Sequence, residues 1–198
     1  MKMAKKFLAV ALAGVLALSV LTGCGASVKS KDVADSLTKM GIKTEQSKDV
    51  DKTAKSTLTA IEAIINSETN TGAAAAAKIT LENAVVAADG KVIKTNTITD
   101  TTNKVQKALG MFTGAGATEA DKANSTKQVR VALVKTEDAT KDASLQAAFV
   151  KEGLVTASAS TLPGSGKKFA ETGKLGTATT KDGKYMLVVI VNDVVDAA

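Results

Sequence analysis

Two stretches near the start of the chain carry apolar residues at helical spacing. In "SKDVADSLTKMG", Val33, Leu37 and Met40 recur with the period of a helix. Ser30 is a favourable N-cap for this helix, and Gly41 suits the position after its end. The pattern therefore predicts a short helix from about Ser30, with one apolar side that faces a core.

A second helix is predicted by a longer apolar stripe. Ser47 can cap this helix, and Asp49 and Asp51 lie in its first turn, where carboxylates interact favourably with the helix dipole. We expect the stripe to be a core face. It consists of Val50, Ala54, Leu58, Ile61 and Ile65.

The middle of the chain carries mixed signals. Residues 79–87 follow an alanine run, which favours a helix, but their apolar positions alternate as in a strand. We favour a strand from about Ile79, and a helix that continues to Ala87 stays an alternative. Asp89-Gly90 predicts a hairpin turn before a strand rich in β-branched residues.

Three further helices are expected. One covers Thr101 to Met111, and another covers Ser144 to Lys151. The third is a short helix around Phe169, after a loop that Pro163 opens. The apolar face expected for the second of these helices consists of Leu145, Ala148 and Phe149.

The last part of the chain reads mainly as strands. "KQVRVALVK" predicts a strand, residues 154–158 predict a short one, and "KLGTATTKDGKYMLVVIVND" predicts two strands joined at Asp182-Gly183. The run from Tyr185 to Val191 is apolar at nearly every position, which indicates a central strand buried on both faces.

Because helices and strands are interleaved, the fold class that we predict is α+β (or α/β). It is a single mixed-sheet domain, residues 30–198, with helices packed on the sheet. A C-terminal hairpin contributes its buried final strand.

The first residues have the zones of a secretory signal. Lys2, Lys5 and Lys6 precede an apolar stretch that is shorter than the roughly 20 residues of a spanning helix. Small residues follow, and then Cys24, the only cysteine of the chain. The motif "LTGC" resembles the lipobox of bacterial lipoprotein precursors. In that family the cysteine sulfur receives a diacylglycerol, the preceding peptide bond is cut, and the cysteine becomes the lipidated N-terminus.

The lipobox resemblance implies a location and an anchor. Residues 1–23 are then the signal peptide and residues 24–29 a lipidated tether, and the membrane is contacted through the diacylglycerol on Cys24 at the extracytoplasmic face. The alternative is an ordinary signal peptide beside an unrelated cysteine. It would leave an unpaired thiol in an oxidising compartment.

Charge argues against nucleic acid as a partner. The chain carries a formal net charge of +6, half of it from the leader lysines, and Arg130 is its only arginine. Recognition of bases and phosphates favours arginine and stacking aromatic side chains, and aromatic residues make up 3% of the chain. We expect partners among small ligands, cell-wall polymers and other envelope proteins.

The absence of histidine removes many kinds of catalytic and metal site. A chain without histidine, with its one cysteine acylated, has no Ser-His-Asp or Cys-His nucleophile and no histidine or thiolate metal site. Carboxylate and lysine chemistry remain. The local carboxylate pairs, which we interpret mainly as caps and solvated surface, are Glu137 with Asp138, Asp193 with Asp196, and Asp49 with Asp51.

Two glycine-bearing loops invite cofactor hypotheses. "LPGSGKKF" lacks both the first glycine and the Ser/Thr after the lysine of a phosphate loop. "FTGAGATEA" resembles the loop at which exported flavoproteins receive FMN on a threonine, with Thr118 as the candidate. The resemblance is broken, because Ala115 stands where Ser or Thr precedes the glycine. We therefore expect a mobile loop and neither a cofactor nor a metal.

The segment "KKFAETGKLGTATTKDGKYMLVVIVND" resembles the closing part of cysteine-rich secretory and pathogenesis-related (CAP) domains. It lacks that family's histidines and tryptophan motif, so no site residue carries over. The function that we expect is a lipid-anchored binding or structural module rather than an enzyme. The alternatives are a degenerate CAP-like exported domain, a carrier of covalent flavin and a carboxylate-dependent wall hydrolase.

Overall fold

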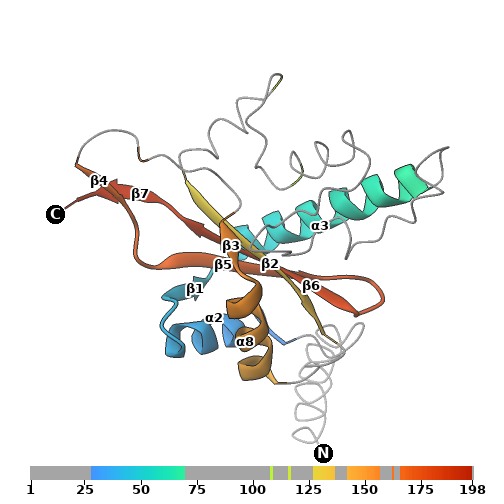
Figure 1. Ribbon diagram of the computed structural model, residues 1–198, viewed down its shortest axis with the longest axis horizontal. Coiled ribbons are helices and arrows are strands. Elements are labelled where there is room, and N and C mark those ends of the chain that lie inside the picture. Colours follow the sequence, from blue (N-terminus) through green and yellow to red (C-terminus); the bar gives the residue numbers. More distant parts are fainter. Residues whose placement is uncertain are drawn as a thin grey trace, which may run out of the picture.

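The structure, a computed structural model, describes residues 28–69, 108, 116, 127–136, 142–156, 162 and 166–197 (Figure 1). The leader and the first tether residues, up to residue 27, lie outside these ranges. The segments predicted at residues 79–99 and nearly all of the helix predicted at residues 101–111 also lie outside them. These assignments stay predictions.

A five-stranded mixed sheet forms the centre of the fold. β1 runs parallel to β5, and all other neighbouring strands are antiparallel. The two strands of the C-terminal hairpin, β5 and β6, lie side by side, and β6 is central as predicted. In spatial order the strands are β1 (Thr44–Gln46), β5 (Gly173–Thr179), β6 (Tyr185–Asn192), β2 (Gln128–Lys135) and β3 (Val155–Thr156).

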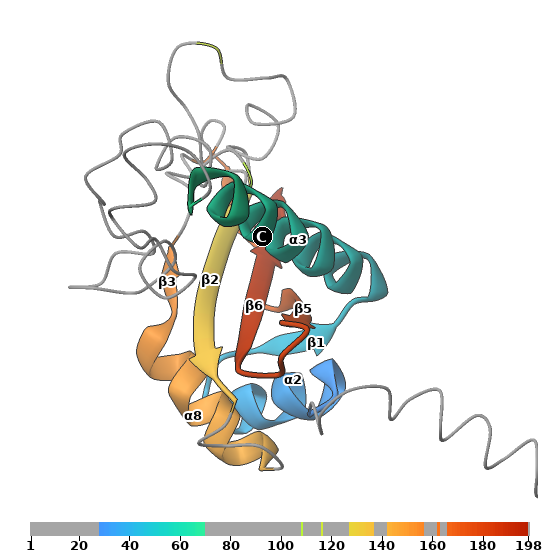
Figure 2. The ribbon, with the colours of Figure 1, turned by 90° about the vertical axis from the view of Figure 1, so that its right-hand side faces the viewer.

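Helices cover both faces of this sheet, which gives the fold three layers (Figure 2). α2 (Ser30–Lys39) and α8 (Ala143–Gly153) lie on one face, and α3 (Lys48–Thr69) lies on the other. Successive side chains of a strand point to opposite faces, and β2 and β6 are buried on both, so each face needs its own cover. The α+β class with helices packed on a mixed sheet is confirmed.

A continuous apolar cluster fills the face under α2 and α8, and we call it the closed core. None of its members is more than 3% exposed. Burying such a side chain contributes roughly 1.5–3 kcal/mol relative to leaving it in water, so this cluster is a main source of stability. Its members are Val33, Ala34, Leu37, Ala132, Val134, Ala147, Val150, Leu175, Met186, Val188 and Ile190.

The buried side of α8 differs from the prediction. Leu145, expected in the core, is 40% exposed, while Phe149 packs partly against the closed core. Asp142 fixes the start of the helix, because its Oδ1 accepts the N–H of Ser144 at 2.8 Å and that of Leu145 at 3.1 Å. Compared with the prediction, the buried side of the helix is shifted by one residue, a rotation of about 100° around the helix axis. The residues buried in α8 are Gln146, Ala147 and Val150.

α3 packs on the opposite face through the stripe predicted from the sequence, and all five of its apolar residues are buried. The helix backbone comes very close to β5 at Gly176. An added Cβ there would lie 2.1 Å from the carbonyl carbon of Val50 and 2.2 Å from the nitrogen of Asp51. Because only glycine leaves room for this approach, Gly176 fixes where α3 begins to cross the sheet.

The side chain of Asp51 joins several elements at the edge of the sheet. β1 pairs with β5 only as far as Leu175, and beyond it the N–H of Thr177 donates to Asp51 Oδ1 at 3.0 Å. Ser30 Oγ donates to the same oxygen at 2.6 Å, and Gln46 Nε2 donates to Oδ2 at 2.5 Å. Asp51 thus acts as an acceptor for β5 where β1 has ended.

The start of α2 differs from the prediction, whereas its end agrees with it. The helix already includes Ser30, and its N-cap is Lys29, which makes no side-chain cap bond. Ser30 instead lies 2.8 Å from Thr177 Oγ1 and bonds to Asp51, so the expected N-cap is wrong by one residue. At the other end Gly41 has φ of 90°, the left-handed conformation that glycine supplies after a helix.

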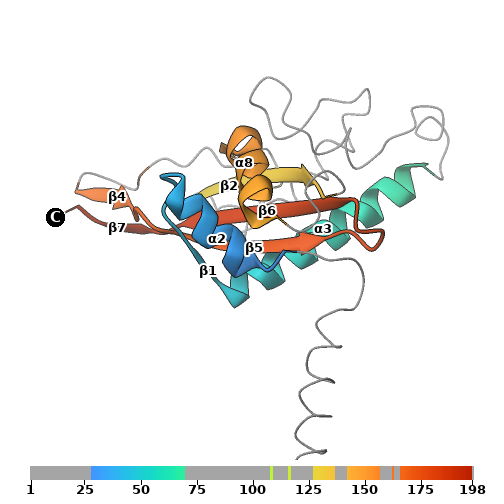
Figure 3. The same ribbon diagram turned by 90° about the horizontal axis from the view of Figure 1, so that it is seen from below.

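A two-stranded ribbon extends the hairpin beyond the sheet. It pairs β4 (Lys167–Phe169) with β7 (Val194–Asp196) and projects past the helices (Figure 3). The short helix predicted around Phe169 is therefore wrong. Phe169 pairs with Val194 in an antiparallel register, and this long-range pairing outweighs a weak local preference.

Candidate functional site

A pocket lies between the first half of α3 and the sheet, and we call it the α3 pocket. Its volume of about 370 Å³ is within the range of small-ligand sites. Its floor consists of Val129, Val131, Val189 and Val191, its wall of Ser47, Val50, Thr53 and Thr57, and its mouth of Asp49, Lys127, Lys174 and Asp193.

The valine floor follows from the alternation of side chains along two strands. In the register between β2 and β6, Val129 lies opposite Val191 and Val131 lies opposite Val189. Their neighbours Ala132, Val188 and Ile190 belong to the closed core on the other face. Four β-branched side chains therefore form one apolar surface beside α3.

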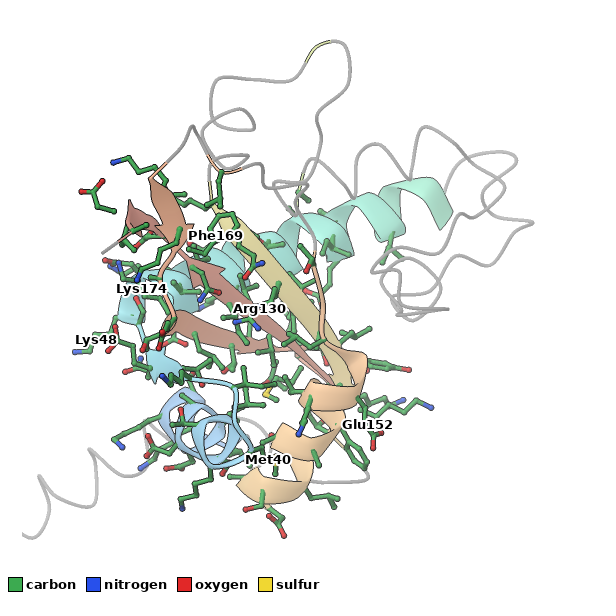
Figure 4. All side chains as sticks on the ribbon, turned by 60° about the vertical axis from the view of Figure 1, so that its left-hand side comes forward. Met40, Lys48, Arg130, Glu152, Phe169 and Lys174 are labelled. Atoms are coloured by element: carbon green, nitrogen blue, oxygen red, sulfur yellow. The ribbon has the colours of Figure 1, made fainter. Side chains whose placement is uncertain are left out.

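The mouth is charged because three strand ends meet there. Lys174 Nζ lies 2.7 Å from Asp193 Oδ2, and Lys127 Nζ lies 3.9 Å from Asp193 Oδ1. Asp193 raises the pKa of Lys174, first through their hydrogen bond and then through its charge. Figure 4 shows Lys174 on the same side of the molecule as Lys48, the first residue of α3. Two lysines thus flank one aspartate above an apolar floor.

The two carboxylates of the first turn of α3 are separated by the fold. Asp49 lies at the pocket mouth, has a 91% exposed side chain and pairs with Lys52 at 3.4 Å. Asp51 points to the sheet edge, where it accepts the hydrogen bonds from Ser30, Gln46 and Thr177 described above. Asp49 and Asp51 therefore do not act as one pair.

The other carboxylate pairs also do not form a shared cleft among the described residues. Asp193 lines the pocket, whereas Asp196 forms an ion pair with Lys167 across the ribbon. Glu137 and Asp138 lie outside the described residues. The fold instead brings Asp49 and Asp193 to one mouth, a combination that their distance in the sequence hides.

The exposure of these two carboxylates bears on their chemistry. The side chain of Asp193 is 37% exposed and that of Asp49 is open to solvent. Carboxylic acids that act as general acids usually lie in apolar surroundings, which favour their neutral form. Both groups at the mouth instead face lysines. This geometry suits recognition of a charged group better than proton transfer.

Arg130 is a second polar feature, on the face of the closed core. Its Nη2 donates to Asn192 Oδ1 at 3.0 Å, and Asn192 Nδ2 donates to the carbonyl of Ala170 at 2.8 Å. Arg130 Nε is buried and has no partner among the described residues, and burial lowers the pKa of this guanidinium. Arg130 lies between Phe169 and Met40 in the view of Figure 4. Arg130 is the only arginine of the chain, but no sequence pattern indicated that its side chain would lie here.

Two residues singled out from the sequence, Cys24 and Thr118, lie outside the described residues. Within the described ranges no three acidic side chains gather as potential metal ligands. None of the helices in these ranges combines the length and the apolar character of a bilayer-crossing segment.

The lysines of the mouth were missed because neither belongs to a motif. Lys127 precedes β2 and Lys174 is the second residue of β5, so they approach each other only through the pairing of both strands with β6. Comparison of the chain with protein-family models, curated proteins and solved structures found no match in any of the three.

Proposed function

We propose that this protein is a lipid-anchored protein of the bacterial cell envelope that binds a small ligand in the α3 pocket and does not transform it. Acylated Cys24 anchors it at the extracytoplasmic face of the membrane. The leader and the "LTGC" motif support the anchor. The α3 pocket supports the binding role, and it is the observation that carries the proposal.

The lining of the pocket indicates the class of ligand. The valine floor favours a short apolar group, because burying it removes apolar surface from water. At the mouth, Lys127 and Lys174 flank Asp193, and Asp49 pairs with Lys52, which lies beside the mouth. The three lysines and two aspartates together carry one positive charge. A small amphiphile with an anionic end matches both parts.

The described residues favour none of the alternative functions. The helix expected at the start of the CAP-like segment is the strand β4. Thr118, the candidate for covalent flavin, lies outside the described residues, as do Glu137 and Asp138. A wall hydrolase would need two carboxylates in one cleft, and the two at the pocket mouth are engaged with lysines.

The binding role is tested by filling the pocket. Thr53 lines it and Thr59 on the same helix does not, so Thr53→Trp and Thr59→Trp are matched variants. We expect hexanoate to bind the parent and Thr59→Trp, and to bind Thr53→Trp at least about tenfold more weakly, a change of roughly 1.4 kcal/mol. Titration calorimetry measures this. Equal binding to both variants, or none to the parent, would contradict the proposal.

The anchor is tested separately. We expect the parent to enter the detergent phase on phase separation and Cys24→Ala to remain in the aqueous phase, because the variant has no sulfur to acylate. Mass spectrometry of the N-terminal peptide identifies the acyl group. A Cys24→Ala protein that still partitions into detergent would show that the cysteine is not the anchor.

A further inference from the structure

We propose that one end of the domain, formed by the start of α2 and the β5–β6 turn, rests against an anionic membrane surface while the α3 pocket faces away from it. This inference rests on the proposed anchoring at Cys24. It specifies which surface of the domain contacts lipid and from which side a ligand enters the α3 pocket. The partner is a bilayer that contains anionic lipid.

The length of the tether limits the distance between the domain and the lipid. Val28 packs against the closed core, and the carbonyl of Lys29 accepts the N–H groups of Asp32 and Val33, so the folded part begins there. From Cys24 to Val28 the chain advances four residues. Fully extended, four residues span about 14 Å. An acyl group on Cys24 therefore keeps the start of α2 close to the headgroups.

The start of α2 lies beside the end of the sheet that carries the β5–β6 turn. Ser30 Oγ is 2.8 Å from Thr177 Oγ1, and β5 continues to Thr179 before the turn. Gly183 in the turn has φ of 72°, and the N–H of Gly183 donates to the carbonyl of Thr180 at 2.9 Å. Figures 1 and 3 show the start of α2 and this turn toward the same end of the molecule. The turn is thus a compact projection next to the tether.

This end carries four exposed lysines, Lys29, Lys31, Lys181 and Lys184. Lys29 and Lys181 form no ion pair among the described residues, whereas Lys31 pairs with Asp35 and Lys184 interacts with the charge of Asp182. Three carboxylates lie among these lysines: Asp35 is 2.5 Å from Lys31, Asp182 accepts the hydroxyl of Thr180 at 2.6 Å, and Asp32 is exposed in the first turn of α2. Lysines near an anionic bilayer strengthen binding roughly fivefold each. Four lysines against three carboxylates leave this end one positive charge in excess, which favours a negatively charged surface.

The α3 pocket lies away from this end in two directions. Along β5, its mouth residue Lys174 is five residues from Thr179, about 17 Å of strand. Across the sheet, the pocket lies on the side of α3, whereas Val28 packs on the side of α2 and α8. The sheet therefore separates the pocket from the attachment point, and a water-soluble ligand reaches it from the side away from the membrane.

Single cysteines test this orientation, because acylation leaves the chain without another thiol. Full-length acylated Lys181→Cys and Lys48→Cys carry the same charge change at opposite ends. Each is labelled with a fluorescent thiol reagent and reconstituted into phosphatidylcholine vesicles that contain phosphatidylglycerol and a headgroup quencher. We expect strong quenching of the label at position 181 and little at position 48.

Two further double variants test the role of charge, each in the Lys181→Cys background. Lys29→Gln with Lys184→Gln should lower the ratio of docked to undocked molecules roughly 25-fold, at about fivefold for each lysine, and quenching should fall. Lys39→Gln with Lys55→Gln removes the same charge elsewhere and should change nothing. Quenching that survives the first pair would overturn the charge-based contact.

The remaining outcomes separate this inference from the proposed function. If mass spectrometry finds no acyl group on Cys24, the anchoring fails and the orientation fails with it. If Cys24 is acylated but the labels at positions 181 and 48 are quenched equally, or the label at position 48 more strongly, the anchoring stands and the orientation is wrong.

Discussion

The two faces of the sheet are made from neighbouring residues of the same strands, but they are covered differently. On one face, two short helices of 10 and 11 residues, α2 and α8, close a continuous apolar core. On the other face, the described residues contribute one helix, α3, of 22 residues, which crosses the sheet with the α3 pocket beside it. A helix is about 10 Å wide, which covers roughly two strands spaced 4.8 Å apart. One helix therefore cannot cover the whole width of the sheet.

This difference shows how a pocket can form without a special sequence motif. The valines of the pocket floor are ordinary strand residues, and the same alternation produces the closed core on the opposite face. In the part of the chain that the structure describes, the pocket lies beside one helix, and the close approach of α3 at Gly176 fixes where that helix crosses the sheet. The same substitution made on each face should therefore change the free energy of unfolding by different amounts.

The largest expected effect compares adjacent residues of β6. Ile190 is fully buried in the closed core, whereas Val191 lines the pocket. Ile190→Asp buries an unpaired carboxylate, and we expect a loss of about 3–5 kcal/mol in the free energy of unfolding. Val191→Asp lies near Lys174 and should lose about 1 kcal/mol. Urea denaturation measures both, and equal losses would show that both faces are closed.

An intermediate effect is expected where α3 touches the sheet. Gly176→Ala places a methyl group on the backbone of Val50, so α3 must move, and we expect a loss of about 1–3 kcal/mol. Gly153→Ala is the matched control, because nothing lies within 4 Å of its added Cβ. Thermal melts of both variants decide the matter, and a neutral Gly176→Ala would mean that α3 shifts freely on the sheet.

The smallest effect is expected outside both faces, at the turn between β5 and β6. The hydroxyl of Thr180 and the N–H of Lys184 donate to Asp182, and both lower the pKa of this carboxyl. Because the folded pKa lies below the ordinary value of about 3.9, the stabilisation is present above about pH 4 and is lost as pH falls through the folded pKa.

Asp182→Asn tests this pH dependence, because the amide resembles the protonated acid. We expect the parent to exceed the variant in unfolding free energy at pH 6, and the difference to shrink as the pH falls below about 4 and through the lowered pKa of Asp182. Solvent screening makes the effect smaller than the two above. A difference that stays constant with pH would show that charge on Asp182 does not stabilise the turn.

Local patterns predicted the elements that have strong periodicity. The stripe from Val50 to Ile65 gave α3, and the apolar run from Tyr185 gave the central strand β6, because burial on one or both faces leaves a clear period in the sequence. The Asp182-Gly183 turn was also predicted, since a position with positive φ favours glycine.

The remaining features depend on contacts between distant residues. Ser30 and Thr177 lie 147 positions apart, so no local pattern shows that Ser30 bonds there instead of capping its helix. β4 is a strand only because β7 pairs with it, and the charged pocket mouth exists only once β2, β5 and β6 are aligned. The prediction failed where tertiary contacts outweigh weak local propensity.

The position of β6 in the sequence has a consequence for the order of folding. β6 is the middle strand of the five-stranded sheet and comes after its other four strands in the chain. A chain that emerges N-terminus first, from a ribosome or through a membrane channel, therefore lacks the strand that joins β5 to β2 until late. Its early helices have no completed sheet to pack on, and long-range strand pairing is slow. Such a chain completes its five-stranded sheet only when its last strands arrive.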